Sequence, residues 1–293
     1  MKPHFILLKK VTKISLFGLW ILILVNCSSD KNSGITDADS NDTIPSIPGW
    51  QLVWNDEFSE PDIDPTKWTY EVNGNGGGNN ELQYYTDESS NSLIIDGNLV
   101  IVAKKEDYTI GNRTWNYTSA RLNSRNKGDW KYGRFDIKAK LPYGQGLWPA
   151  IWMMPTNSVY GGWAASGEID IMELLGQEPT RVYGTLHYGG TYPNNTHTGS
   201  SLKLNAGNFT ETYHLFTLEW EENEFRWYID GNLYLTQNDW YSDKAPYPAP
   251  FDQEFYLILN VAVGGNWPGN PDETTYFPQV MVIDYIRVYK KAE

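Results

Sequence analysis

Cysteine, histidine and basic residues are scarce in this chain of 293 residues, and each shortage excludes a class of site. The single cysteine, Cys27, cannot form an intramolecular disulfide, nor a cysteine-based zinc site alone. The four histidines are too scattered to predict a catalytic zinc centre. With 23 basic against 36 acidic residues, the net charge is -13. A nucleic acid or an anionic membrane surface is therefore a disfavoured partner, whereas a neutral ligand or a cation is easier to accommodate.

Helical periodicity and internal repeats are missing as well. No window of a dozen residues shows the helical apolar period, and no segment recurs, so a helical fold, a propeller or a solenoid is not expected. The sequence instead contains short β-branched and aromatic runs at 51–54, 98–104, 132–141, 147–153, 182–187, 214–220, 225–229, 255–263 and 280–289. Asp96-Gly97 and Asp230-Gly231 predict hairpin turns between such runs. The fold class is therefore all-β, a two-sheet sandwich or a jelly roll.

The amino terminus has the pattern of an export signal. Several lysines precede an apolar run from Ile14 to Val25, which is too short to span a bilayer comfortably. Because the run leads into Cys27 in an order that resembles a bacterial lipobox, residues 1–26 are interpreted as a lipoprotein signal peptide and Cys27 as the lipidated residue. The alternative is a plain secretory signal with an incidental cysteine. Residues 27–48, rich in Ser, Asp, Asn and Pro, are expected to form a flexible tether.

Three acidic residues inside an apolar, strand-like segment are the strongest candidates for chemistry. They are Glu168, Asp170 and Glu173, within residues 166–176. Side chains alternate between the faces of a regular strand, so Glu168 and Asp170 would point one way and Glu173 the other. A β-bulge would return Glu173 to the face of Glu168, and bulges are common beside active sites. We therefore expect a bulge that gathers the three carboxylates on one face.

Carboxylates gathered in this way raise one another's proton affinity, which leaves one ionised and one protonated near neutral pH. Cleavage of a glycosidic bond requires that division of roles. The alternative is a surface strand whose acids only face water, but the flanking Ile169 and Ile171 favour a central strand, where unpaired acids are costly. Aromatic residues make up 15% of the chain, enough to supply both a core and stacking surfaces for sugar rings.

Loops between the predicted strands supply further candidates. The glycine-rich loop 73–80 lacks the Lys-Ser/Thr of a P-loop and opens no helix, so a phosphate site is rejected. This loop either is simply flexible or places Asn79 and Glu81 at a sugar subsite. His187, the segment 194–197 and the loop 264–269 also lie between predicted strands, where binding residues concentrate. A lone histidine such as His187 is as often a structural hydrogen-bonding residue as a ligand.

Six motifs follow one another along the chain: WNDEF at 54–58, NNELQYYT at 79–86, SARL at 119–122, GLWPAIWMM at 146–154, GEIDIME at 167–173 and IDYIRVY at 283–289. Together they resemble glycoside hydrolase family 16, and within it the laminarinase-type endo-β-1,3-glucanases. The resemblance identifies residues 49–293 as a catalytic domain of that family. It implies a curved jelly roll of two antiparallel sheets, a concanavalin A-like sandwich, with the substrate cleft on the concave face.

The resemblance also implies roles for individual residues. Glu168 would be the nucleophile, Glu173 the general acid/base and Asp170 the carboxylate that assists the nucleophile. Their E-x-D-x-x-E spacing matches the bulged form of the family motif rather than the E-x-D-x-E form of its lichenases. The candidates for sugar binding are Asn79, Arg121, Trp148, Trp152, Trp163, His187 and Trp267. No catalytic cofactor is implied, but a structural calcium ion is common in the family, and its matching positions here are Glu57, Gly97 and Asp284.

The resulting expectation is an exported, monomeric outer-membrane lipoprotein, exposed at the cell surface, that cleaves internal β-1,3 bonds of laminarin-like β-glucans with retention. Its partner would be the polysaccharide, not nucleic acid, and the lipid anchor would be its only membrane contact. Alternatives are the same fold acting on mixed-linkage glucan, agar or carrageenan, a non-catalytic β-glucan-binding module, and an interaction protein with an acidic face. Sulfated galactans would require basic residues in the cleft, and binding modules typically lose a catalytic carboxylate. Both considerations favour glucan hydrolysis.

Overall fold

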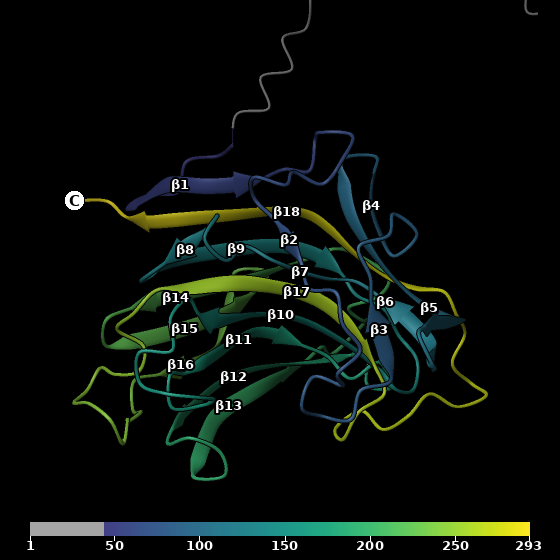
Figure 1. Cartoon of the computed structure of the whole chain (residues 1–293). Coiled ribbons are helices and arrows are strands. Elements are labelled where there is room, and N and C mark those ends of the chain that lie inside the picture. The colour runs from purple at the N-terminus through teal and green to yellow at the C-terminus, as the bar shows by residue number, and fades with distance from the viewer. Residues whose placement is uncertain (1–43) are drawn as a thin grey trace, which may run out of the picture. The chain divides into compact units, whose positions relative to one another are not determined.

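The computed structural model describes residues 44–293, and within them every regular element is a β-strand (Figure 1). The ten-stranded sheet contains, in spatial order, β16 (Asn232–Gln237), β15 (Glu224–Ile229), β14 (His214–Glu221), β9 (Gly133–Lys140), β18 (Gln279–Lys291), β5 (Asn98–Ile110), β6 (Arg113–Ser119) and β3 (Gln83–Tyr85), with β1 (Trp50–Asp56) beside β18 and β4 (Ser92–Ile95) beside β5. The eight-stranded sheet contains β13 (Asn195–Lys203), β12 (Arg181–Gly189), β11 (Glu168–Glu173), β10 (Leu147–Pro155), β17 (Phe255–Val263), β7 (Arg121–Asn123) and β2 (Thr69–Tyr70), with β8 (Asp129–Trp130) beside β17. The prediction of an all-β, two-sheet jelly roll is confirmed.

Strand pairing follows the sequence pattern closely. All nine predicted strands are present, and most of their ends differ from the prediction by a few residues. Among the named strands of residues 44–293, only β3 and β6 pair in parallel. Both Asp-Gly turns are present, with φ of 50° and 71° at Asp96 and Gly97 and 51° and 78° at Asp230 and Gly231. Positive φ at both residues defines the type I′ turn that matches strand twist. Within this part of the chain, no helix has the length and apolar character needed to cross a membrane.

One segment expected to be a loop is a strand. Residues 194–197 were expected to lie between strands, but Asn195–Lys203 forms β13, which pairs with β12 along its whole length. The segment is polar and mostly exposed or half-buried because β13 is the last strand of its sheet. An edge strand of this kind gives no apolar alternation, so the sequence pattern could not reveal it.

The core lies between the two sheets, and strand alternation decides which side chains enter it. On β10, Leu147, Ile151 and Met153 are fully buried in the core, while Trp148 and Trp152 point to the opposite face. Burying a large apolar side chain contributes about 1.5–3 kcal/mol. The alternation therefore fixes the orientation of β10 strongly, because a one-residue slip would exchange its two faces.

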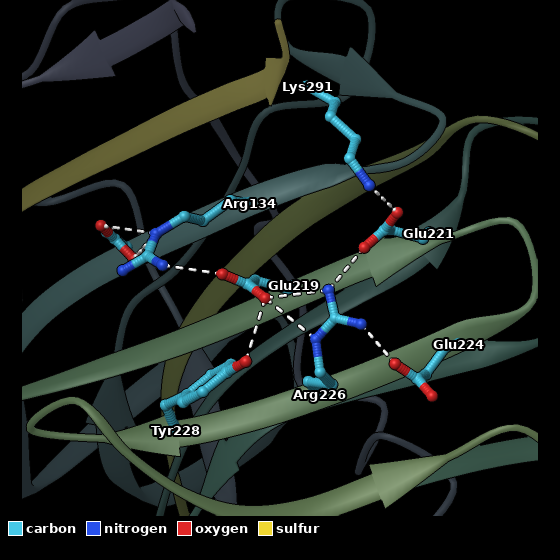
Figure 2. Close-up of polar contacts among 8 residues, drawn as sticks. Arg134, Glu219, Glu221, Glu224, Arg226, Tyr228 and Lys291 are labelled. Atoms are coloured by element: carbon cyan, nitrogen blue, oxygen red, sulfur yellow. Dashed lines mark hydrogen bonds and ion pairs between the residues drawn. The ribbon is translucent and has the colours of Figure 1, made fainter. Parts of the chain in front are cut away.

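The face of the ten-stranded sheet that points away from the core carries a network of ion pairs (Figure 2). Glu219 on β14 accepts hydrogen bonds from Arg134 on β9 at 2.8 Å and from Arg226 on β15 at 3.0 Å. Arg226 also contacts Glu221 and Glu224, and Glu221 contacts Lys291 near the end of β18. The network therefore links four adjacent strands, and nearly every carboxylate in it has a cationic neighbour.

Candidate active site

A cleft of about 1740 Å³ lies on the face of the eight-stranded sheet that points away from the core. The same alternation that builds the core lines this cleft. On β17, Leu259 and Val261 are core residues, whereas Asn260 and Ala262 line the cleft. On β12 the cleft residues are Tyr183, Thr185 and His187. The sheet thus separates an apolar side from a polar and aromatic side.

The β11 strand contains the bulge that the sequence predicts. Towards β10, Ile151 pairs with Met172 and Trp152 with Asp170, so Ile171 has no partner. Ile171 and Met172, although consecutive, are both buried in the core. Alternation is therefore interrupted once, between Asp170 and Glu173. Glu168, Asp170 and Glu173 consequently all line the cleft, and the prediction of a bulge is confirmed.

The opposite sheet supports the bulge from below. Trp227, a core residue of β15, donates its indole N–H to the main-chain carbonyl of Asp170 at 2.9 Å. A buried carbonyl without a partner would cost about 1–3 kcal/mol, so this bond stabilises the interrupted strand. The close approach depends on Gly184 of β12, because a Cβ there would lie 2.7 Å from Cδ1 of Trp227. No L side chain fits at that position without displacing the indole.

Two indoles and one imidazole surround the three carboxylates. Trp163 donates its indole N–H to Oε2 of Glu168 at 2.8 Å. Trp148 donates its indole N–H to Oε1 of Glu173 at 3.0 Å. Nε2 of His187 lies 3.2 Å from Oδ2 of Asp170 and 3.7 Å from Oε1 of Glu168. Because indoles carry no charge, they orient the carboxyl groups and compensate little of their negative charge.

This environment raises the pKa of each carboxyl group. Burial, followed by the charge of Asp170, raises the pKa of Glu168 to about 7, and burial raises the pKa of Asp170 to about 8. Burial, followed by the charges of Asp170 and Glu168, raises the pKa of Glu173 well above its usual value. The group of three therefore retains a proton near neutral pH, where ordinary carboxyl groups are fully ionised. An ionised carboxylate beside a protonated carboxylic acid is the arrangement that glycosidic cleavage needs.

Aromatic side chains form two walls beside the carboxylates. The first contains Trp163 and Tyr192, whose ring centroids are 6.2 Å apart. In the second, Trp267 lies edge-on to Trp148 at 5.4 Å and to Tyr183 at 5.0 Å. Such rings present apolar faces on which the flat, apolar side of a sugar can stack. The cleft is therefore suited to a neutral carbohydrate.

Beyond β10, a series of polar side-chain contacts holds the floor of the cleft in place. The guanidinium of Arg121 lies over the ring of Trp152, 4.7 Å from its centroid, and pairs with Glu71 at 3.1 Å. Trp152 donates its indole N–H to Oδ1 of Asn260 at 2.8 Å, and Asn260 donates to the hydroxyl of Tyr85 at 3.1 Å. These contacts fix the orientation of groups that face the cleft.

All ten residues predicted for catalysis and sugar binding line this one cleft: Glu168, Asp170, Glu173, Asn79, Arg121, Trp148, Trp152, Trp163, His187 and Trp267. Glu81 joins them, so the glycine-rich loop does border the cleft. His197, from the segment 194–197 singled out in the sequence, also lines the cleft, whereas Glu71, Tyr183, Tyr192 and Asn260 are lining residues that sequence reasoning missed. Asn260 could have been found, because it is the only residue between Phe255 and Val263 whose side chain is neither aliphatic nor aromatic.

The positions predicted for calcium lie elsewhere. Asp56 pairs with Ile286 and Ile283 with Leu99, so the register brings Glu57, the Gly97 turn and Asp284 to the same part of β18. The carboxylate of Glu57 is held by Arg287 at 2.7 and 3.0 Å, and Asp284 is held by Lys138 at 2.7 Å. An ion at this place would therefore depend on main-chain carbonyls and the second carboxylate oxygen of Asp284. Cys27 and the predicted signal peptide lie outside the described residues.

Residues 78–287 match Glycosyl hydrolases family 16, and the chain belongs to this family. The chain is 44% identical over 266 residues to glucan endo-1,3-beta-glucosidase A1 of Niallia circulans, covering 85% of this chain and 39% of the relative. It is 41% identical over 295 residues to the beta-glucanase of Rhodothermus marinus, covering 98% and 97%. The laminarinase catalytic domain of Thermotoga maritima MSB8 superposes with a TM-score of 0.74 at 46% identity, covering 83% of this chain and 99% of that domain.

Proposed function

We propose that this protein is an endo-acting glycoside hydrolase that cleaves internal β-1,3 bonds of laminarin-like β-glucans with retention of configuration. The observation that carries the proposal is the bulge that places Glu168, Asp170 and Glu173 on one face of an aromatic cleft. Relatives at 44% and 41% identity named as glucan endo-1,3-beta-glucosidase and beta-glucanase support the choice of linkage.

In the first step, the carboxylate of Glu168 attacks the anomeric carbon while Glu173 donates its proton to the glycosidic oxygen. The bond from that carbon to the glycosidic oxygen breaks, the leaving chain departs as an alcohol, and a covalent glycosyl-enzyme forms on Glu168. In the second step, Glu173 takes a proton from water, which attacks the anomeric carbon and releases Glu168. Asp170 faces Glu168 and holds a proton or a hydrogen bond against it, which tunes its charge.

The cleft residues bind the polysaccharide around this centre. Trp148, Trp163 and Trp267 offer ring surface to sugars, and Trp152 does so on the floor beside Arg121. Asn79 and His187 supply polar contacts from the loop and from β12. Because the cleft is open and holds no basic residue apart from Arg121 and its histidines, we propose a neutral glucan rather than a sulfated galactan as substrate.

The stereochemistry of the products tests the mechanism. Proton NMR at early times of laminarin hydrolysis should show the β-anomer at the new reducing end. Glu168→Ser should lose hydrolysis yet condense an α-glycosyl fluoride donor, because the fluoride then occupies the position of the missing covalent intermediate. An early α-anomer would show inversion and would overturn the roles assigned to Glu168 and Glu173.

A panel of polysaccharides tests the substrate. Laminarin, mixed-linkage glucan, agarose and carrageenan are incubated with residues 49–293, and the products are separated by size. We expect internal cleavage and a series of oligosaccharides from laminarin. Binding without cleavage would instead identify a β-glucan-binding module, and preferential cleavage of another polysaccharide would replace the linkage proposed here.

We also propose that a calcium ion binds beside β18 through main-chain oxygens near Glu57 and Gly97 and through Asp284. An ion bound only by the folded state stabilises it, and one remote from the cleft does not take part in the chemistry. Chelation should lower the melting temperature while leaving hydrolysis at low temperature nearly intact. An unchanged melting temperature on chelation would contradict this calcium site.

We further propose export and anchoring through Cys27, with residues 1–26 as the signal, residues 27–48 as the tether and residues 49–293 as a monomeric domain at the outer surface. The order of lysines, apolar run and Cys27 supports this proposal. Cys27→Ala should move the protein from the membrane fraction to the soluble fraction. Identical fractionation of variant and parent would contradict lipidation.

A further inference from the structure

His187, Glu168 and Asp170 form a compact group of three metal-ligand side chains, the one such group within residues 44–293. One atom from each side chain, Nε2 of His187 and a carboxylate oxygen of the other two, lies within 4.8 Å of both others. The arrangement follows from register, because His187 of β12 pairs with Glu168 of β11 and both side chains face the cleft.

One oxygen of this group is buried without a donor. Oδ2 of Asp170 has no hydrogen-bond partner, although the side chain is only 4% exposed. Nε2 of His187 lies 3.2 Å from this oxygen, but the contact lacks hydrogen-bond alignment. Nδ1 of His187 also has no hydrogen-bond partner, so no contact of that kind fixes the tautomer of the ring. Two lone-pair donors, Nε2 of His187 and Oδ2 of Asp170, therefore lie close together in a mostly buried part of the cleft.

The spacing fits a small transition-metal ion. Zinc binds imidazole nitrogen and carboxylate oxygen at about 2.0–2.2 Å, which sets ligand atoms of a tetrahedron about 3.3–3.6 Å apart. The distances of 3.2 Å and 3.7 Å from Nε2 of His187 to the two carboxylates lie close to that interval. Calcium requires six to eight oxygen ligands at longer distances, so a site of two carboxylates and one imidazole disfavours it.

We propose that Glu168, Asp170 and His187 bind a Zn²⁺ ion, with a water molecule at the fourth position towards the cleft. The ion would neutralise two carboxylates that contact no lysine or arginine among the ion pairs of the described residues. Since the ion would occupy Glu168, binding of Zn²⁺ and of substrate exclude each other. The inhibition that follows rests on the proposed hydrolase function, whereas the binding site does not.

The binding test is calorimetric titration of chelator-treated protein with ZnCl₂, in a non-coordinating buffer on the alkaline side of neutrality. We expect one ion per chain, and the same titration with excess CaCl₂ present should give the same affinity. His187→Gln and, as a second variant, Asp170→Asn should each weaken binding by about tenfold or more, since each removes one ligand.

A matched control lies beside the site. His197 of β13 also lines the cleft, and its ring centroid is 5.4 Å from that of His187, but it belongs to no such group of three. His197→Gln should therefore retain the affinity for Zn²⁺. Co²⁺ in place of Zn²⁺ should give the strong visible absorption of tetrahedral cobalt in the parent and in His197→Gln, but not in His187→Gln. Equal losses in both histidine variants, or no binding by the parent, would overturn the site.

An activity measurement separates this proposal from the proposed function. If laminarin is hydrolysed, Zn²⁺ should raise KM and leave kcat unchanged, and a chelator should reverse the effect. Zinc binding without hydrolysis of any polysaccharide would support the metal site and contradict the proposed hydrolase function. Hydrolysis that does not change at saturating concentrations of Zn²⁺ would contradict the metal site and support the proposed hydrolase function.

Discussion

Glu219 and Glu221, on the outer face of the ten-stranded sheet, contact guanidinium or ammonium groups, whereas Glu168 and Glu173 in the cleft receive hydrogen bonds from neutral indoles. The effect on proton affinity is opposite. Hydrogen bonds from Lys291 and then Arg226 lower the pKa of Glu221, whereas burial raises the pKa of Glu168 to about 7. Both groups lie on interior strands of their sheets, so the difference comes from burial and from the charge of the neighbouring side chains.

The contrast separates carboxylates that hold the fold from carboxylates that remain reactive. A carboxylate paired with arginine stays ionised at every pH of interest and cannot donate a proton. A buried carboxylate with only neutral donors keeps a pKa near the working pH, which general acid–base catalysis requires. Stability and reactivity are therefore assigned to different sheets, and exchanging residues between the two groups should exchange their effects.

The largest change, a loss of activity, is expected when Glu173, the proposed general acid, is replaced. Glu173→Gln keeps the shape and the hydrogen bond from Trp148 but cannot donate a proton, so kcat on laminarin should fall by about 10²–10⁴-fold. A β-glucoside with a dinitrophenyl leaving group needs no protonation and should lose much less. Glu221→Gln on the outer face is the control and should leave kcat unchanged. A similar loss on both substrates would show that Glu173 is not the acid.

Removing a carboxylate from the cleft should stabilise the protein at alkaline pH. The pKa of Glu168 is raised in the folded state to about 7, from about 4.5 when unfolded, so the parent loses stability as pH rises through this interval. Glu168→Gln cannot ionise, and it should exceed the parent in free energy of unfolding at pH above 7 by roughly 1–3 kcal/mol. Chemical denaturation at alkaline and at acid pH measures the difference, which should vanish at pH below 4.

Trp227 connects the two sheets at the bulge, and its loss tests whether the fold supports the chemistry there. Trp227→Phe keeps most of the ring and removes the N–H, which leaves the carbonyl of Asp170 unsatisfied and should cost about 1–3 kcal/mol of stability. Because the bulge then loses an anchor, kcat should fall while KM changes little. Loss of stability with unchanged kcat would show that the bulge holds its position without Trp227.

The smallest change in stability is expected for Glu221 on the outer face of the ten-stranded sheet. Its dependence on pH should have the opposite sign to that of Glu168. The folded-state pKa of Glu221 is lowered, so its contribution to stability is present above the unfolded value and is lost as pH falls through the folded value. Glu221→Gln should therefore destabilise the protein near neutral pH, by less than about 1 kcal/mol, and salt should reduce the difference. An effect as large as that of Glu168→Gln, or a gain in stability, would contradict the comparison.

The sequence predicted those parts of the fold and site that depend on alternation. The apolar residues around Glu168 placed β11 in the middle of a sheet, and the E-x-D-x-x-E spacing required a bulge for all three acids to face one way. The edge strand β13 escaped prediction because it has no apolar face. Tyr183 and Tyr192 escaped because nothing in sequence distinguishes an aromatic residue in a cleft wall from one in a core. The Trp227 contact joins residues far apart in the chain, which no local pattern reveals.

The bulge can also be described by the parity of residue numbers. Cleft residues of β10 and β17 are all even and those of β12 are all odd, whereas β11 begins with the even Glu168 and Asp170 and ends with the odd Glu173. Omitting one residue from the pair Ile171 and Met172 would restore a single parity and the E-x-D-x-E spacing, with the same three acids facing the cleft. The additional residue therefore adds nothing to the set of acids. It adds an apolar side chain to the core and turns the Asp170 carbonyl towards Trp227, so the longer spacing fastens the reactive strand to the opposite sheet.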